Sequence, residues 1–259
     1  MKNRIDTMFE QKHNLLSIYF TAGYPHIDDT MPILQALQEA GVDFVEIGMP
    51  FSDPLADGPV IQLAGNEALK NGMTIKKLLS QIRNMRQQIT IPVLLMGYIN
   101  PVMHYGIEQF AADAQVAGVD GIILPDLPWD EYVEQYKNIF DSHNLHFIPL
   151  IAPQTPDERI RHIDADAEGF IYTVASAGIT GNISTSVDYR TQYFDRIKNL
   201  HLRNKNVIGF GIKDNASYTH ACAHADGAII GTAFIKHIQQ KGATKDSVIS
   251  FVKSILNKE

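Results

Sequence analysis

Eight short apolar runs recur along the chain, and each is followed by a longer segment with helical spacing. The runs are near-continuous rather than alternating, as expected of strands that are covered on both faces. They are LLSIYF (15–20), DFVEIG (43–48), IPVLLM (91–96), DGIIL (120–124), HFIPLI (146–151), GFIYTV (169–174), NVIGF (206–210) and GAII (227–230). The pattern predicts eight buried strands of a parallel sheet.

The segments between the runs predict helices that cover these strands. One spans 30–41 and ends at Gly41, a residue type common just after the end of a helix. Others span 129–143 and 155–166, and the latter opens with Thr155 as the expected cap and Pro156 in the first turn. The N-terminal segment predicts a short amphipathic helix and lacks the apolar core of a signal peptide.

Eight strand–helix units in 259 residues predict an α/β fold of the (β/α)8 TIM-barrel type. No linker or low-complexity segment interrupts the series, so we expect a single TIM-barrel domain over residues 1–259 with a short N-terminal helix. A doubly wound open sheet is the alternative. It gives no reason for functional-looking residues to follow so many different strands.

Composition narrows the class of protein. The chain has 22 Lys and Arg against 29 Asp and Glu, a net charge of −7 without basic runs, which disfavours a nucleic-acid binder. No apolar stretch approaches the length of a membrane span. The single cysteine, Cys222, cannot form an internal disulfide, which favours a reducing compartment. We expect a soluble, cytoplasmic protein that binds neither nucleic acid nor membrane.

The loops that follow the strands carry the candidate chemistry, because catalytic groups of such barrels lie at the C-terminal strand ends. GFGI (209–212) and IIGTAF (230–235) place glycines where backbone N–H groups can approach an anion, and the second also opens a helix. AGITG (177–181) adds glycines from the neighbouring loop. The alternative is that these glycines only form tight turns, but three glycine-rich loops at one corner of the barrel favour a phosphate site. With no Arg there, we expect backbone dipoles to do most of the binding.

Two carboxylates stand at the second strand. Glu46 falls on the face opposite Val45 and Ile47, so it is expected to point into the barrel mouth. The alternative is a structural carboxylate bonded to loop N–H groups. Asp57 follows in ADGP, an ordinary turn sequence, so a turn residue and a functional one are equally compatible with its spacing.

These loops resemble the family of tryptophan synthase alpha subunits. The resemblance is carried by EIGMPFSDPLADGPVIQ (46–62), YFTAGYP (19–25), LPDLP (124–128), AGITG, GFGI and GTAF (231–234), which occur in the family's order over nearly the whole chain. It implies a carbon–carbon lyase of tryptophan biosynthesis, which cleaves indole-3-glycerol phosphate into indole and glyceraldehyde 3-phosphate. It also implies that no cofactor and no metal take part.

The resemblance assigns roles to individual residues. Glu46 corresponds to the general acid/base, and Asp57 to the carboxylate that receives the indole N–H. Tyr172 corresponds to a tyrosine beside the substrate and Glu46, with an aromatic core residue as the alternative. Thr180 corresponds to the threonine of the loop that closes over the site. The phosphate is assigned to Gly181, Phe210, Gly211, Gly231 and Thr232, and the indole slot to Phe20, Ile61, Tyr98, Ile123 and Ile229.

The resemblance also implies a partner, the beta subunit of an α2β2 assembly, which receives the indole. The loop that holds Pro50, Asp53 and Pro54 is expected to contact it, unless that loop is merely solvated. The chain departs from the family's usual residues at Tyr24, Ala175, Lys213 and Thr232, none of which removes a proposed catalytic group. These departures bear on the fine phosphate contacts.

Three rival interpretations remain. Lys213 follows the seventh strand, where a lysine could form a Schiff base. His220 and His224 have a ligand-like spacing on one helix, but that helix leads away from the barrel mouth. A binding protein that mainly activates a partner, with poor turnover of its own, is the third.

Overall fold

The computed structural model describes residues 2–174 and 187–257 of the chain. Within these ranges, short strands pair in parallel with their neighbours throughout. The strands are β1 (Leu15–Thr21), β2 (Phe44–Gly48), β3 (Val93–Met96), β4 (Gly121–Ile123), β5 (His146–Phe147), β6 (Leu150–Ile151), β7 (Phe170–Val174), β8 (Lys205–Gly209) and β9 (Gly227–Ile230). Every predicted apolar run is found as a strand, so the strand prediction is confirmed.

The sheet closes into a barrel through its shortest strands. Its order is β5-β4-β3-β2-β1-β9-β8-β7-β6, and the two outermost strands are pieces of one chain run separated by Ile148 and Pro149. The N–H of Ile148 donates to the carbonyl of Ile122 at 2.9 Å, and the N–H of Tyr172 donates to the carbonyl of Pro149 at 2.9 Å. β5 and β6 together therefore make the fifth barrel strand, which confirms the predicted (β/α)8 barrel.

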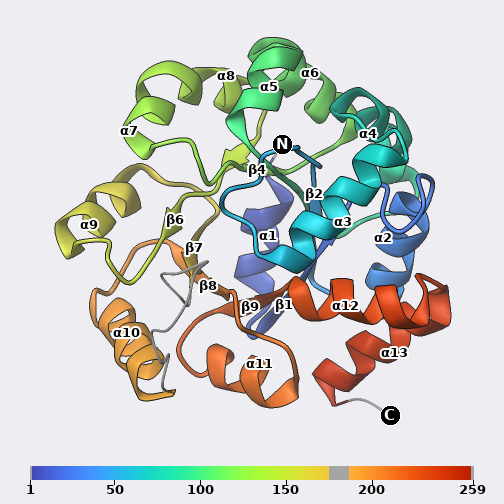
Figure 1. Ribbon diagram of the computed structural model, residues 1–259. Coiled ribbons are helices and arrows are strands. Elements are labelled where there is room, and N and C mark those ends of the chain that lie inside the picture. Colours follow the sequence, from blue (N-terminus) through green and yellow to red (C-terminus); the bar gives the residue numbers. More distant parts are fainter. Residues whose placement is uncertain (1, 175–186, 258–259) are drawn as a thin grey trace.

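Helices surround the barrel, as Figure 1 shows. The major helices are α1 (Arg4–Gln11), α2 (Thr30–Glu39), α3 (Pro59–Lys70), α4 (Ile75–Ile82), α5 (Ile99–Tyr105), α6 (Ile107–Ala117), α8 (Lys137–Ser142), α9 (Asp157–Asp166), α10 (Val187–Asn199), α11 (Asn215–Cys222), α12 (Thr232–Lys241) and α13 (Lys245–Leu256). Shorter turns are the 3-10 helix η1 (Met85–Gln87), α7 (Trp129–Glu131) and the π-helical η2 (Tyr132–Tyr136). None of the helices within the described ranges is long and apolar enough to cross a membrane.

The predicted helices are present, with local differences. The segment 129–143 divides into α7, the π-helical turn η2 and α8. The cap predicted for α9 is wrong by one position, because Pro156 occupies the cap and Asp157 begins the helix. The Thr155 hydroxyl instead accepts a hydrogen bond from the N–H of Ala152 at 3.0 Å, inside the preceding turn.

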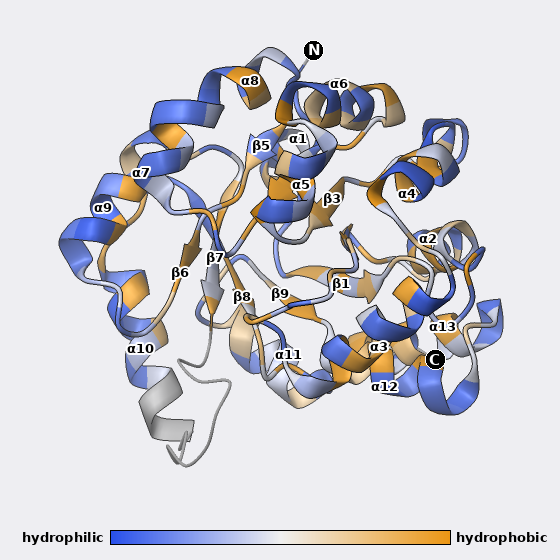
Figure 2. Ribbon diagram, turned by 45° about the horizontal axis from the view of Figure 1, so that its top comes forward, coloured by the Kyte–Doolittle hydropathy of each residue, from blue (hydrophilic) through white to orange (hydrophobic). Residues whose placement is uncertain are grey.

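Two hydrophobic layers hold the fold together. The outer layer lies between the strands and the helices, and Figure 2 shows hydrophobic strands inside a shell of helices with hydrophilic outer faces. The inner layer fills the barrel and includes Ile5, Met8 and Phe9 of α1, whose Phe9 ring lies 5.7 Å from that of Phe170. The guanidinium of Arg4 binds the buried carboxylate of Asp120 at 2.8 Å. The apolar side chains of the N-terminal helix therefore pack against the inner layer, and the helix is anchored to the start of β4.

Candidate active site

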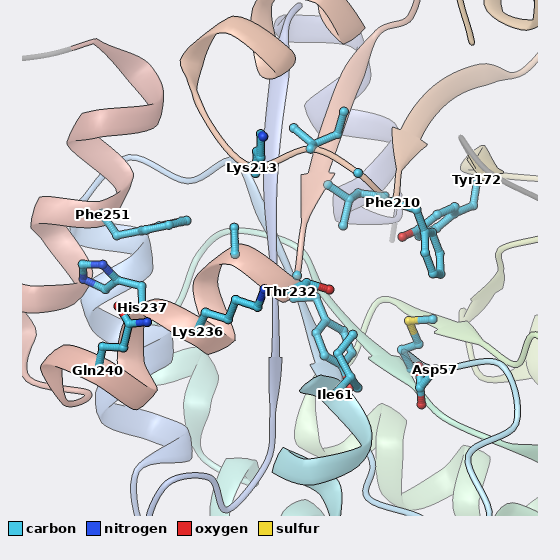
Figure 3. Close-up of a pocket in the computed structure, with 17 residues that line it drawn as sticks. Asp57, Ile61, Tyr172, Phe210, Lys213, Thr232, Lys236, His237, Gln240 and Phe251 are labelled. Carbon is cyan, nitrogen blue, oxygen red and sulfur yellow. The ribbon is translucent and has the colours of Figure 1, made fainter. Parts of the chain in front are cut away.

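A cavity of about 600 Å3 lies over the C-terminal ends of the strands. Figure 3 shows Asp57 and Tyr172 on one side of it, His237 and Phe251 on the other, and Thr232 between them. The lining residues are Tyr19, Asp57, Ile61, Met96, Tyr172, Phe210, Gly211, Ile212, Lys213, Ile229, Gly231, Thr232, Ala233, Lys236, His237, Gln240 and Phe251. The loops after β2, β8 and β9, which the sequence analysis marked as functional, therefore meet at one site.

Glu46 lies inside the barrel, as the alternation of β2 predicts. Phe44 on the same face belongs to the inner layer, whereas Val45 and Ile47 belong to the outer layer. The Glu46 side chain is fully buried, and neither carboxyl oxygen has a hydrogen-bond partner among the described residues. Burial without a partner disfavours the charged form, and it raises the pKa of Glu46 from 4.5 to about 8. The alternative of a carboxylate bonded to loop N–H groups finds no support in the described residues.

Two tyrosines flank this carboxyl and form part of the cavity wall. Tyr19 is the residue directly beside Glu46 in the β1–β2 register, and its hydroxyl covers Gly48, where a Cβ would lie 2.1 Å away. Tyr172 repeats the arrangement on β7, with its hydroxyl 2.2 Å from the place of a Cβ at Gly209 on β8. Burial, followed by the charge of Glu46, raises the pKa of Tyr172 far above its ordinary value. Glu46 does not itself line the cavity, but it lies next to the two rings that do.

Asp57 lines the cavity from the loop after β2. The hydroxyl of Tyr98 donates a hydrogen bond to its carboxylate at 3.1 Å and accepts one from the N–H of Ala56 at 2.9 Å. Burial raises the pKa of Asp57 from 3.8 to about 6, while the bond from Tyr98 lowers it. The two acids of the second strand and its loop thus have distinct pKa values, with Glu46 the higher.

Backbone groups suited to an anion face the same cavity. Phe210 and Gly211 have left-handed backbones, with φ of 68° and 78°, and the Phe210 ring meets Tyr172 edge-on at 6.2 Å. Gly231 is the N-cap residue of α12 and Thr232 its first residue, so the free N–H groups of this helix start at the cavity. Of the residues predicted to bind phosphate, these four are brought together. Gly181, with Thr180 and Ala175, lies outside the described residues.

Only some of the residues predicted to form the indole slot line the cavity. Ile61 and Ile229 line the cavity. Ile123 is buried in the inner layer but does not reach the cavity wall, and Tyr98 reaches the site through Asp57. The placement of Phe20 is wrong, because its side chain points out of the barrel into the layer beneath the helices. Its neighbour Tyr19 points inward in its stead, since successive strand residues face opposite sides.

Sequence reasoning missed several residues of the cavity. Tyr19 could have been found by applying to β1 the alternation used for Glu46. Met96 ends β3 and borders the cavity, where a methionine looked like ordinary core. Lys236 and His237 line it from α12, and the spacing of four residues from Thr232 is the signal that could have indicated Lys236.

The loop predicted to meet a partner lies on the rim. Pro50 and Pro54 are partly buried, and Asp53 is exposed and accepts a hydrogen bond from the hydroxyl of its neighbour Ser52. Asp53 lines a second hollow, of about 450 Å3, together with Leu55 and Tyr98. Leu55 is 83% exposed, and Met103 on α5 is 53% exposed. The rim therefore presents exposed apolar side chains next to the site.

The residues behind two of the rival interpretations lie in different parts of the structure. Lys213 lines the cavity. His220 lies on α11, but His224 lies beyond the end of that helix at Cys222, so the prediction that one helix carries both is wrong. Their ring centroids are 5.0 Å apart, and the Nδ1 atom of His224 lies 3.0 Å from the carboxylate of Asp195 on α10. Across the described ranges, there is no group of three or more side chains that could hold a metal ion.

Comparison with known proteins identifies the family. A family model described as tryptophan synthase alpha chain matches residues 5–258. A tryptophan synthase alpha chain of Christiangramia forsetii is 51% identical over 253 residues, 98% of each chain, and one of Flavobacterium psychrophilum is 49% identical over 98% of this chain and 99% of its own. The structure of tryptophan synthase subunit alpha from Legionella pneumophila has a TM-score of 0.89 at 32% identity, covering 99% of this chain and 98% of that one. Tryptophan synthase from M. tuberculosis in an aminoacrylate-bound form has a TM-score of 0.85 at 27% identity, covering 98% of both chains. The resemblance inferred from the loops is confirmed, and the chain belongs to the tryptophan synthase alpha chain family.

Proposed function

We propose that this chain catalyses the alpha reaction of tryptophan synthase, the retro-aldol cleavage of indole-3-glycerol phosphate to indole and glyceraldehyde 3-phosphate. Besides family membership, one observation supports the proposal: the cavity has different chemical groups at its two ends. Asp57 and Tyr172 lie at one end, and the start of α12 at Thr232 lies beyond them. A substrate with an indole N–H at one end and a phosphate at the other matches this polarity.

The two acids divide the chemistry. With a pKa of about 8, Glu46 is mostly protonated at neutral pH and gives its proton to indole C3. Asp57, with a pKa of about 6, is mostly ionised, so it accepts the indole N–H and stabilises the positive charge that develops on the ring. The Glu46 carboxylate then takes the proton of the hydroxyl on the adjacent side-chain carbon. As the carbon–carbon bond breaks, its electrons return to the ring, which leaves neutral indole, an aldehyde and a reprotonated Glu46.

No cofactor is needed in this scheme. Protonation at C3 turns the indole ring into an electron sink, which is the role that a Schiff base or a metal would otherwise fill. Lys213 is the residue that a Schiff-base mechanism would use, since it lines the cavity. The substrate carries hydroxyl groups and no carbonyl, so a lysine has no group to condense with before cleavage. Borohydride treatment during turnover is expected to leave Lys213 unmodified, and a covalent adduct that forms there with the substrate but not with glyceraldehyde 3-phosphate alone would overturn the carboxylate mechanism.

The partner in this proposal is a beta subunit, which receives the indole in an α2β2 assembly. The rim loop with Pro50, Asp53 and Pro54 is the proposed contact, and the exposed side chains of Leu55 and Met103 support it. The proposal places the protein in the cytoplasm, in keeping with its single, unpaired Cys222.

Indole release from indole-3-glycerol phosphate tests the proposed function, measured with and without a tryptophan synthase beta subunit. We expect release by the chain alone and faster release with the beta subunit. Absence of release in both cases would refute the function. Release only with the beta subunit would favour the alternative, a protein that acts mainly through its partner.

A further inference from the structure

We propose that the ammonium group of Lys236 binds the phosphate of the substrate, so that the phosphate subsite carries a formal positive charge in addition to its backbone N–H groups. This inference rests on the proposed function, because the phosphate in question is that of indole-3-glycerol phosphate. It adds a side-chain cation to the backbone dipoles that the sequence analysis expects to do most of the binding.

The geometry of α12 directs Lys236 to the subsite. The helix begins at Thr232, and Lys236 follows four residues later, which places both on one helix face. Long helical side chains lean toward the N-terminus and cover the preceding turn. Figure 3 shows Lys236 reaching along α12 toward Thr232, and both residues line the cavity.

Lys236 has no carboxylate to neutralise it in the part of the chain that the structure describes. Ion pairs in this part of the chain include those of Lys2, Lys12, Lys137, Lys205 and Lys245. Asp57 is the only carboxylate among the described residues that line the cavity, and Figure 3 shows it on the far side of Thr232 from Lys236. The ammonium group is therefore available to an anion at the helix start.

The charge of the whole chain makes this local cation useful. With a net charge of −7, the protein repels a phosphorylated substrate at long range. Positive charge inside a cleft concentrates field lines there and raises the local concentration of an anion. Lys213 also lines the cavity, but in Figure 3 its side chain points away from Thr232, so we assign the direct contact to Lys236.

Steady-state kinetics of Lys236→Gln test the assignment. Loss of one charge-assisted contact to phosphate is expected to raise KM for indole-3-glycerol phosphate by about tenfold, with kcat changed by less than about twofold. The inhibition constant of glycerol 3-phosphate should rise by a similar factor, and Lys236→Arg should restore most of the affinity. The matched control is Lys241→Gln, an exposed lysine of the same helix that does not line the cavity.

Indole serves as the control ligand for the Lys236→Gln variant, because it lacks the phosphate. The affinity of Lys236→Gln for indole is expected to equal that of the unsubstituted protein, which would show that the variant is folded and its slot intact. Unchanged KM and unchanged inhibition by glycerol 3-phosphate would refute the role of Lys236, even if the protein cleaves the substrate. An unsubstituted protein that releases no indole would instead refute the proposed function.

Discussion

Tyr19 lies directly beside Glu46 across β1 and β2, and its hydroxyl reaches two residues further along the neighbouring strand to cover Gly48. Tyr172 makes the same reach from β7 to Gly209 of β8. Each tyrosine therefore depends on a glycine for its position, and together they separate the Glu46 carboxyl from solvent. This shielding raises the pKa of Glu46 to about 8 and gives the carboxyl its proton at neutral pH.

The pH dependence of kcat/KM is expected to be bell-shaped. Below about pH 6 Asp57 gains a proton and no longer stabilises the positive ring, and above about pH 8 Glu46 has lost the proton that it must donate. The maximum should lie near pH 7. The second ionisation of the substrate phosphate also falls near pH 6, so inhibition by glycerol 3-phosphate across the same range serves as the control. A rate that continues to rise above pH 8 would show that Glu46 acts first as a base.

Tyr98→Phe is expected to move the acidic limb of this profile to higher pH. The Tyr98 hydroxyl donates to the Asp57 carboxylate at 3.1 Å, and this bond lowers the pKa of Asp57. Its loss favours the protonated form, so the pKa rises, by up to about one unit. The basic limb should stay in place, which makes it the internal control. An unmoved acidic limb would show that another group produces it.

Glu46→Gln is expected to stabilise the protein at alkaline pH. The folded state retains the Glu46 proton up to about pH 8, whereas the unfolded chain loses it near pH 4.5. The native protein therefore loses stability as pH rises through this window, by about 1.4 kcal/mol per pH unit. Glutamine has no proton to lose, so this loss of stability at high pH does not occur in the variant. Urea unfolding at pH 5 and pH 8 should show the gain only at pH 8, and the exposed Glu134→Gln is the matched charge-removal control. Equal effects at both pH values would contradict a raised pKa.

Gly209→Ala is expected to lower kcat/KM by roughly ten- to a hundredfold, because the added Cβ would lie 2.2 Å from the Tyr172 hydroxyl and displace the ring from the cavity wall. Gly65→Ala is the control, since a Cβ there meets nothing within 4 Å. Both variants are assayed for indole release and thermal unfolding. If Gly209→Ala folds and keeps full activity, the position of Tyr172 does not matter for the reaction.

The barrel was predictable because its signals are local and repeated. Each strand is a continuous apolar run between segments of helical spacing, and the eight units leave few alternatives. The break of the fifth strand into β5 and β6 and the π-helical turn η2 were not predictable in this way. They arise from how the chain fits its neighbours, which a periodic pattern does not record.

Site residues were predictable where their position along a strand determines which way the side chain points. Alternation along β2 placed Glu46 inside the barrel, but the same rule was not applied to β1, which is why Phe20 was chosen over Tyr19. The bond from Tyr98 to Asp57 joins residues 41 positions apart, so no spacing rule could indicate it. The cation at Lys236 was missed because a lysine on a surface helix is ordinary, and only the cavity gives it meaning.

The measurement that tests the central claim most directly is indole release by Glu46→Gln, made alongside the binding of glycerol 3-phosphate and indole. The substitution keeps the shape of the side chain but removes the proton donor. We expect the rate of release to fall by at least about a hundredfold, with both ligands still bound at near-native affinity. Release at a rate close to that of the unsubstituted protein would show that the buried carboxyl of the second strand is not the acid of this reaction.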